Sequence, residues 1–340
     1  LGKLRIAYPK WPCPESEVLH IARLRRAHDV EIRFEQIRGR TASDCRSEDS
    51  AFGASGSPLR EPGRDFFRRF RGQDVIVISP HSDDSVIGCG GLVYYLRNRE
   101  LWARHRQENG GAFVDVLVMS SSPRGVSVRE FDRYCDAVGI GPQRPPRHSG
   151  LHAQLRAQMR RNEALGEAFL LDAETHWMDL GVDDGENRTL LADKLKEVRA
   201  AGKAGRRFTV LIPPFTDEHR THRWVRELVL HVLCMEEEYR TSDLCDVWVY
   251  ESPWAALTPG NIDIILPLDK HAIFAKCQAI AMHQSQEVRT RYSEVARSQA
   301  RRQAEILPEE VFAFGGEAHG WDFVEVFQDL TWQKTIYEAA

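Results

Sequence analysis

The 340-residue sequence has no long apolar run and no closely spaced pair of cysteines. No stretch approaches the roughly 18–20 apolar residues that a membrane-spanning helix needs. The first residues, LGKLRIAYPKWPCPESE, lack the unbroken apolar core of a signal peptide. The seven cysteines are scattered, which argues for reduced thiols and against a disulfide scaffold or a cysteine-rich zinc knuckle. We therefore expect a cytoplasmic protein with no membrane partner.

An excess of charge of one sign is also missing. The chain has 46 basic and 50 acidic residues, a net charge of −4. This balance gives no support for a nucleic-acid partner. The composition is otherwise ordinary for a globular protein, with 42% hydrophobic and 28% charged residues. It excludes a disordered, collagen-like or coiled-coil chain, and the length allows a core large enough for an enzyme.

The first seventy residues differ from the remainder. Their first forty residues predict a strand, a helix and a second strand. About 25 residues rich in Ser, Gly, Pro and charge follow, which predicts a linker. A short basic helix, RDFFRRFRG, leads into the next element. We therefore expect an N-terminal extension over residues 1–70 and a main domain over residues 71–340.

Strands and helices alternate through the main domain. The apolar run DVIVISP at residues 74–80 is typical of a buried parallel strand. The same reasoning predicts strands in 112–121, 175–182, 207–214 and 246–253, and an edge strand in 321–328. It predicts helices near 86–101, 127–138, 151–171, 190–201, 217–238, 269–283 and 292–305. This alternation predicts an α/β fold with a Rossmann-like, mostly parallel sheet and helices on both faces. In such sheets ligands bind beyond the carboxyl ends of the strands.

Polar residues follow the first of these strands, in the segment SPHSDDS. It contains His81 and the adjacent carboxylates of Asp83 and Asp84. Adjacent aspartates at a strand–helix junction are most often a helix cap. A histidine beside them at a strand end is hard to explain as core packing.

A second cluster, DEHRTH at residues 217–222, follows the strand at 207–214 and opens a helix. His219 and His222 are three residues apart and therefore share one face of that helix. A lone H-x-x-H is more often a pair of exposed histidines. Two imidazoles and a carboxylate, however, suit a divalent transition metal, and three protein ligands leave a fourth position open for water. Two such clusters at two strand ends of one sheet favour a metal site.

Four segments resemble motifs of the PIG-L/LmbE-like family of zinc-dependent N-deacetylases. PHSDDSVIGCGG resembles P-H-P-D-D-E-x-x-G-x-G-G, and DEHRTHRWV resembles D-x-H-x-D-H. RRNEA at residues 160–164, followed by HWMDLGVDDG, is similar to the family's R-x-x-E-A helix and the strand end after it. KCQAIAMHQSQ at residues 276–286 is similar to K-x-x-A-x-x-x-H-x-S-Q. The four matches occur in the family's order and cover about residues 73–330.

The resemblance implies a LmbE-like fold and a role for each matching residue. His81, Asp84 and His222 would bind one zinc ion per chain. Asp83 would be the general base that activates water. His219 would stabilise the oxyanion or protonate the leaving amine. Zinc polarises an amide carbonyl and acidifies water, so the implied roles agree with the chemistry of amide hydrolysis.

The sequence departs from the family pattern at three positions. Ser82 stands where the family has Pro, and Thr221 stands where it has Asp. Ser85 stands where the family has Glu, so a carboxylate is missing from the expected site. This difference puts the substrate class, and even the activity, in question.

Four residues are candidates for substrate contact. Ser85 follows the aspartate pair, and Arg124 follows the strand at 112–121. Asp217 precedes the histidine pair and could orient an imidazole. His283 ends a predicted helix. An exposed loop arginine is the alternative for Arg124, and a packing histidine is the alternative for His283.

The glycines at 88, 90 and 91 raise the alternative of a dinucleotide site. A Rossmann phosphate loop requires its glycines in the turn directly after the strand. Here they begin ten residues after Ile78, inside the next helix. We therefore predict that they permit close packing between helix and sheet.

The leading hypothesis is a zinc hydrolase that removes an acetyl group from an N-acetylated amino sugar or glycoside of small size. The alternatives are a non-catalytic sugar-binding relative and a non-haem Fe(II) oxygenase that uses His81, Asp83 and His222 as a facial triad. The familiar form of that triad sits on an all-β fold, unlike this sequence. A homo-oligomer is compatible with the sequence.

Overall fold

The computed structural model describes residues 64–98, 101–102, 112–120, 125–140, 144–180, 184–201, 207–236, 239, 245–306, 312–313 and 321–330. They divide into two compact units: Ser127–Ala153 lies in one, and 64–126 with 154–330 lies in the other. The first unit contains α6 (Val128–Ala137), whose first turn is capped by Ser127 Oγ, which accepts from the backbone N–H of Glu130. The elements expected within residues 1–63 lie outside the described residues, so the domain boundary near residue 70 stays a prediction.

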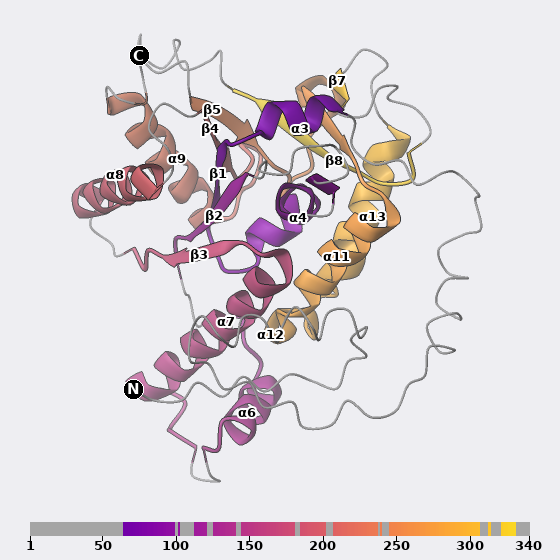
Figure 1. Cartoon of the computed structure of the whole chain (residues 1–340). Coiled ribbons are helices and arrows are strands. Elements are labelled where there is room, and N and C mark those ends of the chain that lie inside the picture. The colour runs from indigo at the N-terminus through magenta and orange to yellow at the C-terminus, as the bar shows by residue number, and fades with distance from the viewer. Residues whose placement is uncertain are drawn as a thin grey trace. The chain divides into compact units, whose positions relative to one another are not determined.

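The second unit is built on an eight-stranded sheet with the order β3-β2-β1-β4-β5-β8-β6-β7 (Figure 1). Its strands are β1 (Asp74–Ser79), β2 (Phe113–Val118), β3 (Glu174–Trp177), β4 (Phe208–Ile212), β5 (Cys245–Val249), β6 (Ile264–Pro267), β7 (Phe312–Ala313) and β8 (Val324–Asp329). The first five run parallel to one another. β8 runs antiparallel between β5 and β6. The predicted Rossmann-like, mostly parallel sheet is therefore confirmed.

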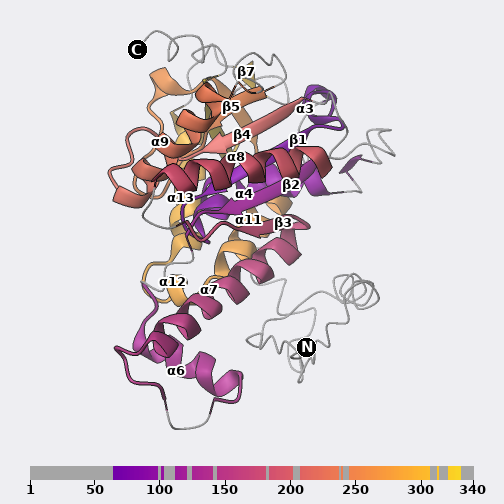
Figure 2. The same ribbon diagram turned by 90° about the vertical axis from the view of Figure 1, so that its left-hand side faces the viewer.

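Helices cover both faces of this sheet. They are α3 (Arg64–Phe70), α4 (Asp84–Arg97), α7 (Gly150–Leu171), α8 (Asp184–Ala201), α9 (Arg220–Met235), α11 (Lys270–Ala281), α12 (Gln284–Glu287) and α13 (Tyr292–Glu305), with a 3₁₀ turn at Pro259–Asn261. Figure 2 shows α8 lying across the strands of one face, with α9 beside it. On the other face α4 contacts β1, β2 and β8, and α11 and α13 pack against α4.

The core lies on both faces of β1, because successive side chains of a strand point to opposite faces of the sheet. All six residues of β1 are buried, because helices cover the strand from both sides. Ile76 and Ile78 belong to the core that Leu195 of α8 and Val229 of α9 complete. A central strand that is apolar on both faces is what the continuous run DVIVIS predicts.

The glycines of α4 lie where a side chain has no room. A Cβ atom at Gly88 would come 2.2 Å from Cδ2 of Tyr250, the residue after β5. A Cβ atom at Gly91 would come 2.5 Å from Cδ2 of Leu268. The helix therefore approaches its neighbours more closely than any other residue would allow, as the sequence predicts.

Three strands differ from the expectation. The segment predicted as an edge strand, 321–328, forms β8 in the interior of the sheet between β5 and β6. The strands β6 and β7 were not expected, because four and two residues are too few to show a clear apolar pattern. In the part of the chain that the structure describes, no helix combines the length and apolar character needed to cross a bilayer.

Candidate metal centre

The two polar clusters meet at the carboxyl ends of β1 and β4, which are neighbours in the sheet. From β1 the chain continues to β2 on one side, whereas from β4 it continues to β5 on the other side. The strand order therefore reverses between β1 and β4. This is the topological switch point at which open parallel sheets bind their ligands.

The turn between β1 and α4 is held by its own side chains. Ser79 Oγ accepts a 3.0 Å hydrogen bond from the backbone N–H of Ser85 and donates to the carbonyl oxygen of His81. Oδ2 of Asp84 accepts a 2.8 Å hydrogen bond from the backbone N–H of His81. These bonds bring the His81 ring and the Asp84 carboxylate to the same side of the turn.

The turn between β4 and α9 is organised by Asp217. The strand ends at a pair of prolines, 213 and 214, which lack the N–H that would continue its ladder. Oδ1 of Asp217 accepts a 2.9 Å hydrogen bond from the backbone N–H of His219, just before α9 begins. Its Oδ2 lies 2.7 Å from Nδ1 of His222. The other ring nitrogen of His222, Nε2, therefore faces the β1 turn.

Three side-chain atoms from these turns form a nearly equilateral triangle. Nδ1 of His81 lies 3.1 Å from Oδ2 of Asp84 and 3.2 Å from Nε2 of His222. Nε2 of His222 lies 3.1 Å from the same oxygen of Asp84. Ligand atoms of a tetrahedral zinc ion, bound at about 2.0 Å, lie about 3.3 Å apart. The three groups therefore have the spacing and the chemistry of a zinc ligand set.

His219 lies beside this triangle. Its ring centroid lies 4.7 Å from that of His222 and 5.1 Å from that of His81. A nitrogen of each of the three rings lies within 4.8 Å of the other two. Unlike buried His222, His219 is exposed. Its partial desolvation and the nearby charges of His222 and His81 lower its pKa, which favours a neutral imidazole.

Electrostatics within the triangle favour charged groups. Burial by itself would raise the pKa of Asp84, but the charges and hydrogen bonds of His222 and His81 hold it well below its usual range. Burial would lower the pKa of His222, but Asp84 and Asp217 raise it. In the absence of a metal the carboxylates thus favour a cation at this place.

Asp83 makes its side-chain contact outside the triangle. Its Oδ1 accepts a 2.5 Å hydrogen bond from Nη2 of Arg160, and Nε of the same arginine donates to Oγ of Ser82 at 3.0 Å. Within the described part of the chain, Oδ2 of Asp83 accepts no hydrogen bond. The two adjacent aspartates therefore have different surroundings: Asp84 meets imidazoles, and Asp83 meets a guanidinium group.

One face of α7 carries buried charge that contacts the β1–α4 turn and the residues around the start of α12. Glu163 follows Arg160 on this face of the helix. Its Oε1 accepts a 2.7 Å hydrogen bond from the backbone N–H of Ser285, and its Oε2 accepts a 2.6 Å hydrogen bond from Ser285 Oγ. One turn further, Glu167 accepts from Ser85 Oγ at 3.3 Å and lies 2.6 Å from Nε2 of His283. Burial raises the pKa of both glutamates.

The residues predicted to contact substrate lie in different positions. Ser85, Asp217 and His283 are each at most 1% exposed and are hydrogen-bonded to protein groups. Nδ1 of His283 is buried and has no hydrogen-bond partner among the described residues. Arg124 lies outside the described residues. Contact of these four with substrate stays a prediction.

Sequence reasoning did not assign a role to the charged face of α7. Arg160 and Glu163 belong to a matching motif, but Glu167 was not singled out. The available signal is the spacing i, i+3 and i+7, which places the three charges on one face of a helix. Charged residues on the face that also carries buried apolar residues such as Ala164 and Leu171 indicate internal ion pairs.

Comparisons with known proteins agree with this architecture. No family model matches the chain. Over 72 residues the chain is 33% identical to a protein of Bacteroides thetaiotaomicron described as a putative glucosamine-6-phosphate deaminase-like protein. That match covers 21% of this chain and only 11% of the relative's length.

Solved structures that resemble most of the chain include a deacetylase and a hydratase. N,N′-diacetylchitobiose deacetylase from Pyrococcus horikoshii superposes with a TM-score of 0.52 at 18% identity, over 89% of this chain and 97% of that one. GalB, the 4-carboxy-2-hydroxymuconate hydratase from Pseudomonas putida, gives a TM-score of 0.50 at 18% identity, over 76% and 96%. A deacetylase and a hydratase on one fold show that the fold does not decide the reaction. The chain has the LmbE-like α/β fold that its motifs predict.

Proposed function

We propose that this chain is a zinc-dependent hydrolase that removes an acetyl group from an N-acetylated amino sugar. The observation that carries the proposal is the triangle of His81, Asp84 and His222, whose three donor atoms lie 3.1–3.2 Å apart at the switch point of the sheet. The motifs support the same three residues as zinc ligands. The fold shared with diacetylchitobiose deacetylase supports the sugar class.

The proposed roles divide between two adjacent carboxylates. When bound by the triangle, zinc supplies Lewis-acid chemistry, polarising the amide carbonyl and acidifying water. Asp83 takes a proton from the attacking water on Oδ2, because its Oδ1 is held by Arg160. The ion pair fixes the direction of that free oxygen. A carboxylate base with one oxygen held in an ion pair populates few orientations in which the other oxygen cannot reach the water.

His219 is proposed to act on the opposite side of the substrate carbonyl. It is exposed beside the triangle, and its lowered pKa favours the neutral imidazole. Its N–H then donates to the oxygen that becomes negative as the amide is attacked. Because Asp217 holds the backbone N–H of His219 and the ring of His222 together, the donor keeps a fixed place relative to the proposed metal ligands.

The geometry also bears on the Fe(II) alternative. That hypothesis requires Asp83 to complete a triad with His81 and His222. The contacts favour Asp84 instead, since its Oδ2 lies 3.1 Å from both histidine nitrogens whereas Asp83 is paired with Arg160.

The test is bound-metal stoichiometry in the wild type, Asp83→Ala and Asp84→Ala, purified without chelators, together with acetate release from N-acetylglucosamine and its β-1,4-linked disaccharide. We expect about one zinc per wild-type chain, loss of zinc in Asp84→Ala, and retained zinc without acetate release in Asp83→Ala. Loss of metal in Asp83→Ala alone would support the facial triad. Absence of metal from every form would support a non-catalytic sugar-binding protein.

A further inference from the structure

Three metal-ligating side chains meet at one edge of the sheet, outside the metal centre. Asp115 is on β2, and Glu174 and His176 are on β3, the strand that ends the sheet next to β2 (Figure 1). One ligand atom of each residue lies within 4.8 Å of those of the other two. We call this group the β3 edge cluster. None of its residues belongs to the triangle at the metal centre.

The register of the two parallel strands brings these side chains together. Asp115 lies directly opposite Glu174. Leu117, two residues further along β2, lies opposite His176. Because successive side chains of a strand alternate between the faces of a sheet, all four point to the same face. Leu117 belongs to the core that α8 and α9 cover, so the β3 edge cluster stands on the α8 side of the sheet.

The β3 edge cluster combines like charges without a full complement of cations. Two carboxylates directly opposite each other on neighbouring strands repel one another. Among the described residues, the carboxylate of Glu174 has no hydrogen-bond or ion-pair partner. Glu197 of α8 adds a third carboxylate nearby: its 2.7 Å bond to Lys194 and the charge of that lysine lower its pKa, and the charge of His176 lowers it further. A bound cation would relieve the repulsion between the two strands.

The donor atoms suit a first-row divalent ion such as zinc. Nε2 of His176 lies 2.7 Å from Oδ1 of Asp115, and these side chains are only 16% and 14% exposed. Neighbouring ligand atoms of an ion bound at about 2.0–2.1 Å lie about 3 Å apart, so this pair needs only a small shift. Glu174 is exposed and can turn toward the pair. The imidazole favours zinc over magnesium and calcium, which take oxygen ligands.

We propose that Asp115, Glu174 and His176 form a second divalent-metal site, which binds zinc more weakly than the metal centre. The weaker affinity follows from a single imidazole and an exposed carboxylate, in place of the two imidazoles and the buried carboxylate of the triangle. The bound ion would join β3 to β2. β3 has four residues and pairs with a neighbour on one side only, so an ion that bridges the two strands would oppose its opening. This inference does not depend on the proposed function.

Equilibrium dialysis of the full chain against rising concentrations of zinc, followed by metal analysis, counts the ions bound per chain. We expect a tight first step and a weaker second step. His176→Gln and Glu174→Gln should each weaken the second step by at least about tenfold and leave the first step unchanged. Because Glu174 is exposed, its variant tests the site with little effect on the fold.

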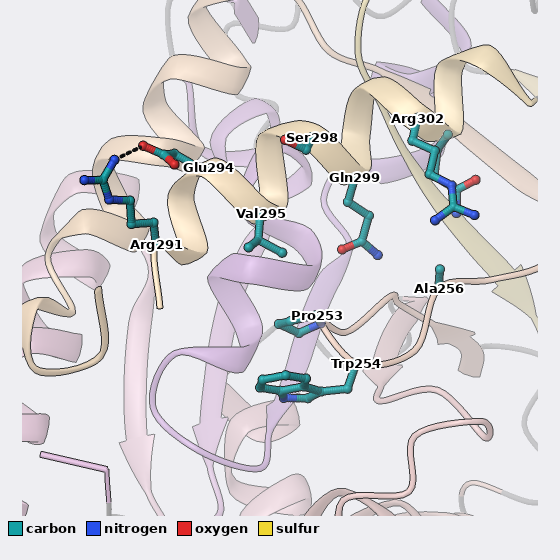
Figure 3. Close-up of a pocket in the computed structure, with 10 residues that line it drawn as sticks. Pro253, Trp254, Ala256, Arg291, Glu294, Val295, Ser298, Gln299 and Arg302 are labelled. Atoms are coloured by element: carbon teal, nitrogen blue, oxygen red, sulfur yellow. Dashed lines mark hydrogen bonds and ion pairs between the residues drawn. The ribbon is translucent and has the colours of Figure 1, made fainter. Parts of the chain in front are cut away.

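Two matched controls remove the same chemical groups elsewhere. His231→Gln removes a half-buried histidine of α9. Glu294→Gln removes an exposed carboxylate of α13, which pairs with Arg291 at 2.8 Å beside a groove of about 610 Å³ (Figure 3). Both controls should bind zinc in the same two steps as the wild type.

Amide hydrogen exchange tests whether the ion joins the two strands. At a free zinc concentration of about ten times the second Kd, exchange of the amides of residues 174–177 should slow about tenfold in the wild type, because opening β3 first requires release of the ion. The same zinc concentration should not slow these amides in His176→Gln. Unchanged exchange in the wild type would overturn the assignment of the second ion to this edge.

The dialysis has two further outcomes that would overturn the proposal. One is a wild-type chain that binds no second zinc even in millimolar zinc. The other is an equal second step in every variant, because the ion would then lie elsewhere on the surface. If the wild type binds a single zinc and His176→Gln abolishes it, the metal centre fails and the proposed function fails with it, whereas the β3 edge site stands.

Discussion

Nη2 of Arg160 lies 2.5 Å from Oδ1 of Asp83, and both side chains are largely buried. The arginine comes from the middle of α7, 77 residues away in the chain. Its Nε donates in addition to Ser82, so one planar group fixes two consecutive residues of the β1–α4 turn. This ion pair ties the proposed base to a helix that carries none of the proposed zinc ligands.

We therefore expect Arg160→Met to lower the free energy of unfolding by about 3 kcal/mol, because it leaves the Asp83 carboxylate buried without its partner. Zinc content should stay at the wild-type value, since the triangle is untouched. Urea unfolding and metal analysis measure the two effects. Arg160→Lys is the matched control, because it keeps the positive charge but loses the planar guanidinium group that reaches both Ser82 and Asp83. Its free energy of unfolding should lie between those of the wild type and Arg160→Met. Equal stability of all three proteins would contradict the prediction.

A second prediction concerns the orientation of His222. Its Nδ1 lies 2.7 Å from Oδ2 of Asp217, which fixes the tautomer with Nε2 free for a metal. Asp217→Asn should weaken zinc binding by about 10- to 100-fold, as expected when the partner of a ligating imidazole is lost. Competition with a chromophoric chelator gives the Kd.

The chain offers a control with the same chemistry at another place. Asp115 of β2 and His176 of the edge strand β3 also have side-chain atoms 2.7 Å apart. Asp115→Asn should leave the Kd for zinc at the centre unchanged. Similar losses in both variants would indicate a general effect on the fold, and unchanged affinity in Asp217→Asn would remove the assigned orienting role.

The third prediction is a pH dependence of stability that arises from Glu251. This buried carboxyl accepts a 2.7 Å hydrogen bond from the backbone N–H of Leu257 and another from Gln303. Burial raises its pKa from an ordinary value of 4.5 to about 7, although these hydrogen bonds and the charge of Lys276 oppose the rise. The pKa of Glu251 is higher in the folded state than in the unfolded state. The contribution of this carboxyl to the free energy of unfolding is therefore fully present below pH 4.5 and is lost as the pH rises through about 7.

The shift corresponds to about 3 kcal/mol for this group. Glu251→Gln cannot ionise and should lack this contribution. The difference in unfolding free energy between wild type and Glu251→Gln should therefore change by about 3 kcal/mol between pH 4.5 and pH 8, in favour of the variant at high pH. Urea titrations of both proteins across that range measure it. A constant difference would contradict the assigned pKa.

Much of the fold was predictable because local pattern and burial agree. β1, β4 and β5 are mostly apolar in sequence and buried along their whole length, so their sequences indicate buried parallel strands. The pairing order is not local. The segment 321–328 carries Glu325, which suggests an exposed edge. In the fold this carboxylate is buried against Nζ of Lys276 at 2.7 Å, which allows β8 to lie inside the sheet.

The candidate site likewise has residues that local motifs reveal and residues that only the fold brings together. His81 and Asp84 are three residues apart in one turn, and two contiguous motifs were enough to select them together with His222. Glu167 contacts Ser85 from 82 residues away, and no local pattern links the two. Groups that touch the proposed zinc are therefore visible in the sequence, whereas the helix that supports them becomes visible only in the fold.

The last prediction addresses the serine that stands where the family motif has a glutamate. Oε1 of Glu167 accepts from Ser85 Oγ at 3.3 Å in a fully buried place, so a carboxylate reaches this position from α7. Ser85→Glu would set two carboxylates against each other there and should lower the free energy of unfolding by about 3 kcal/mol. Ser85→Ala loses one long hydrogen bond and should cost about 1 kcal/mol.

The double variant Ser85→Glu/Glu167→Ala separates compensation from simple crowding. If Glu167 occupies the place of the missing glutamate, removing it should relieve the repulsion. The double variant should then be more stable than the sum of the single variants predicts, by about 1–2 kcal/mol. Urea unfolding of the four proteins of this cycle measures the coupling. If the losses of unfolding free energy are additive, residues 85 and 167 act independently. In that case Glu167 does not replace the glutamate of the family motif, and the site has one carboxylate fewer.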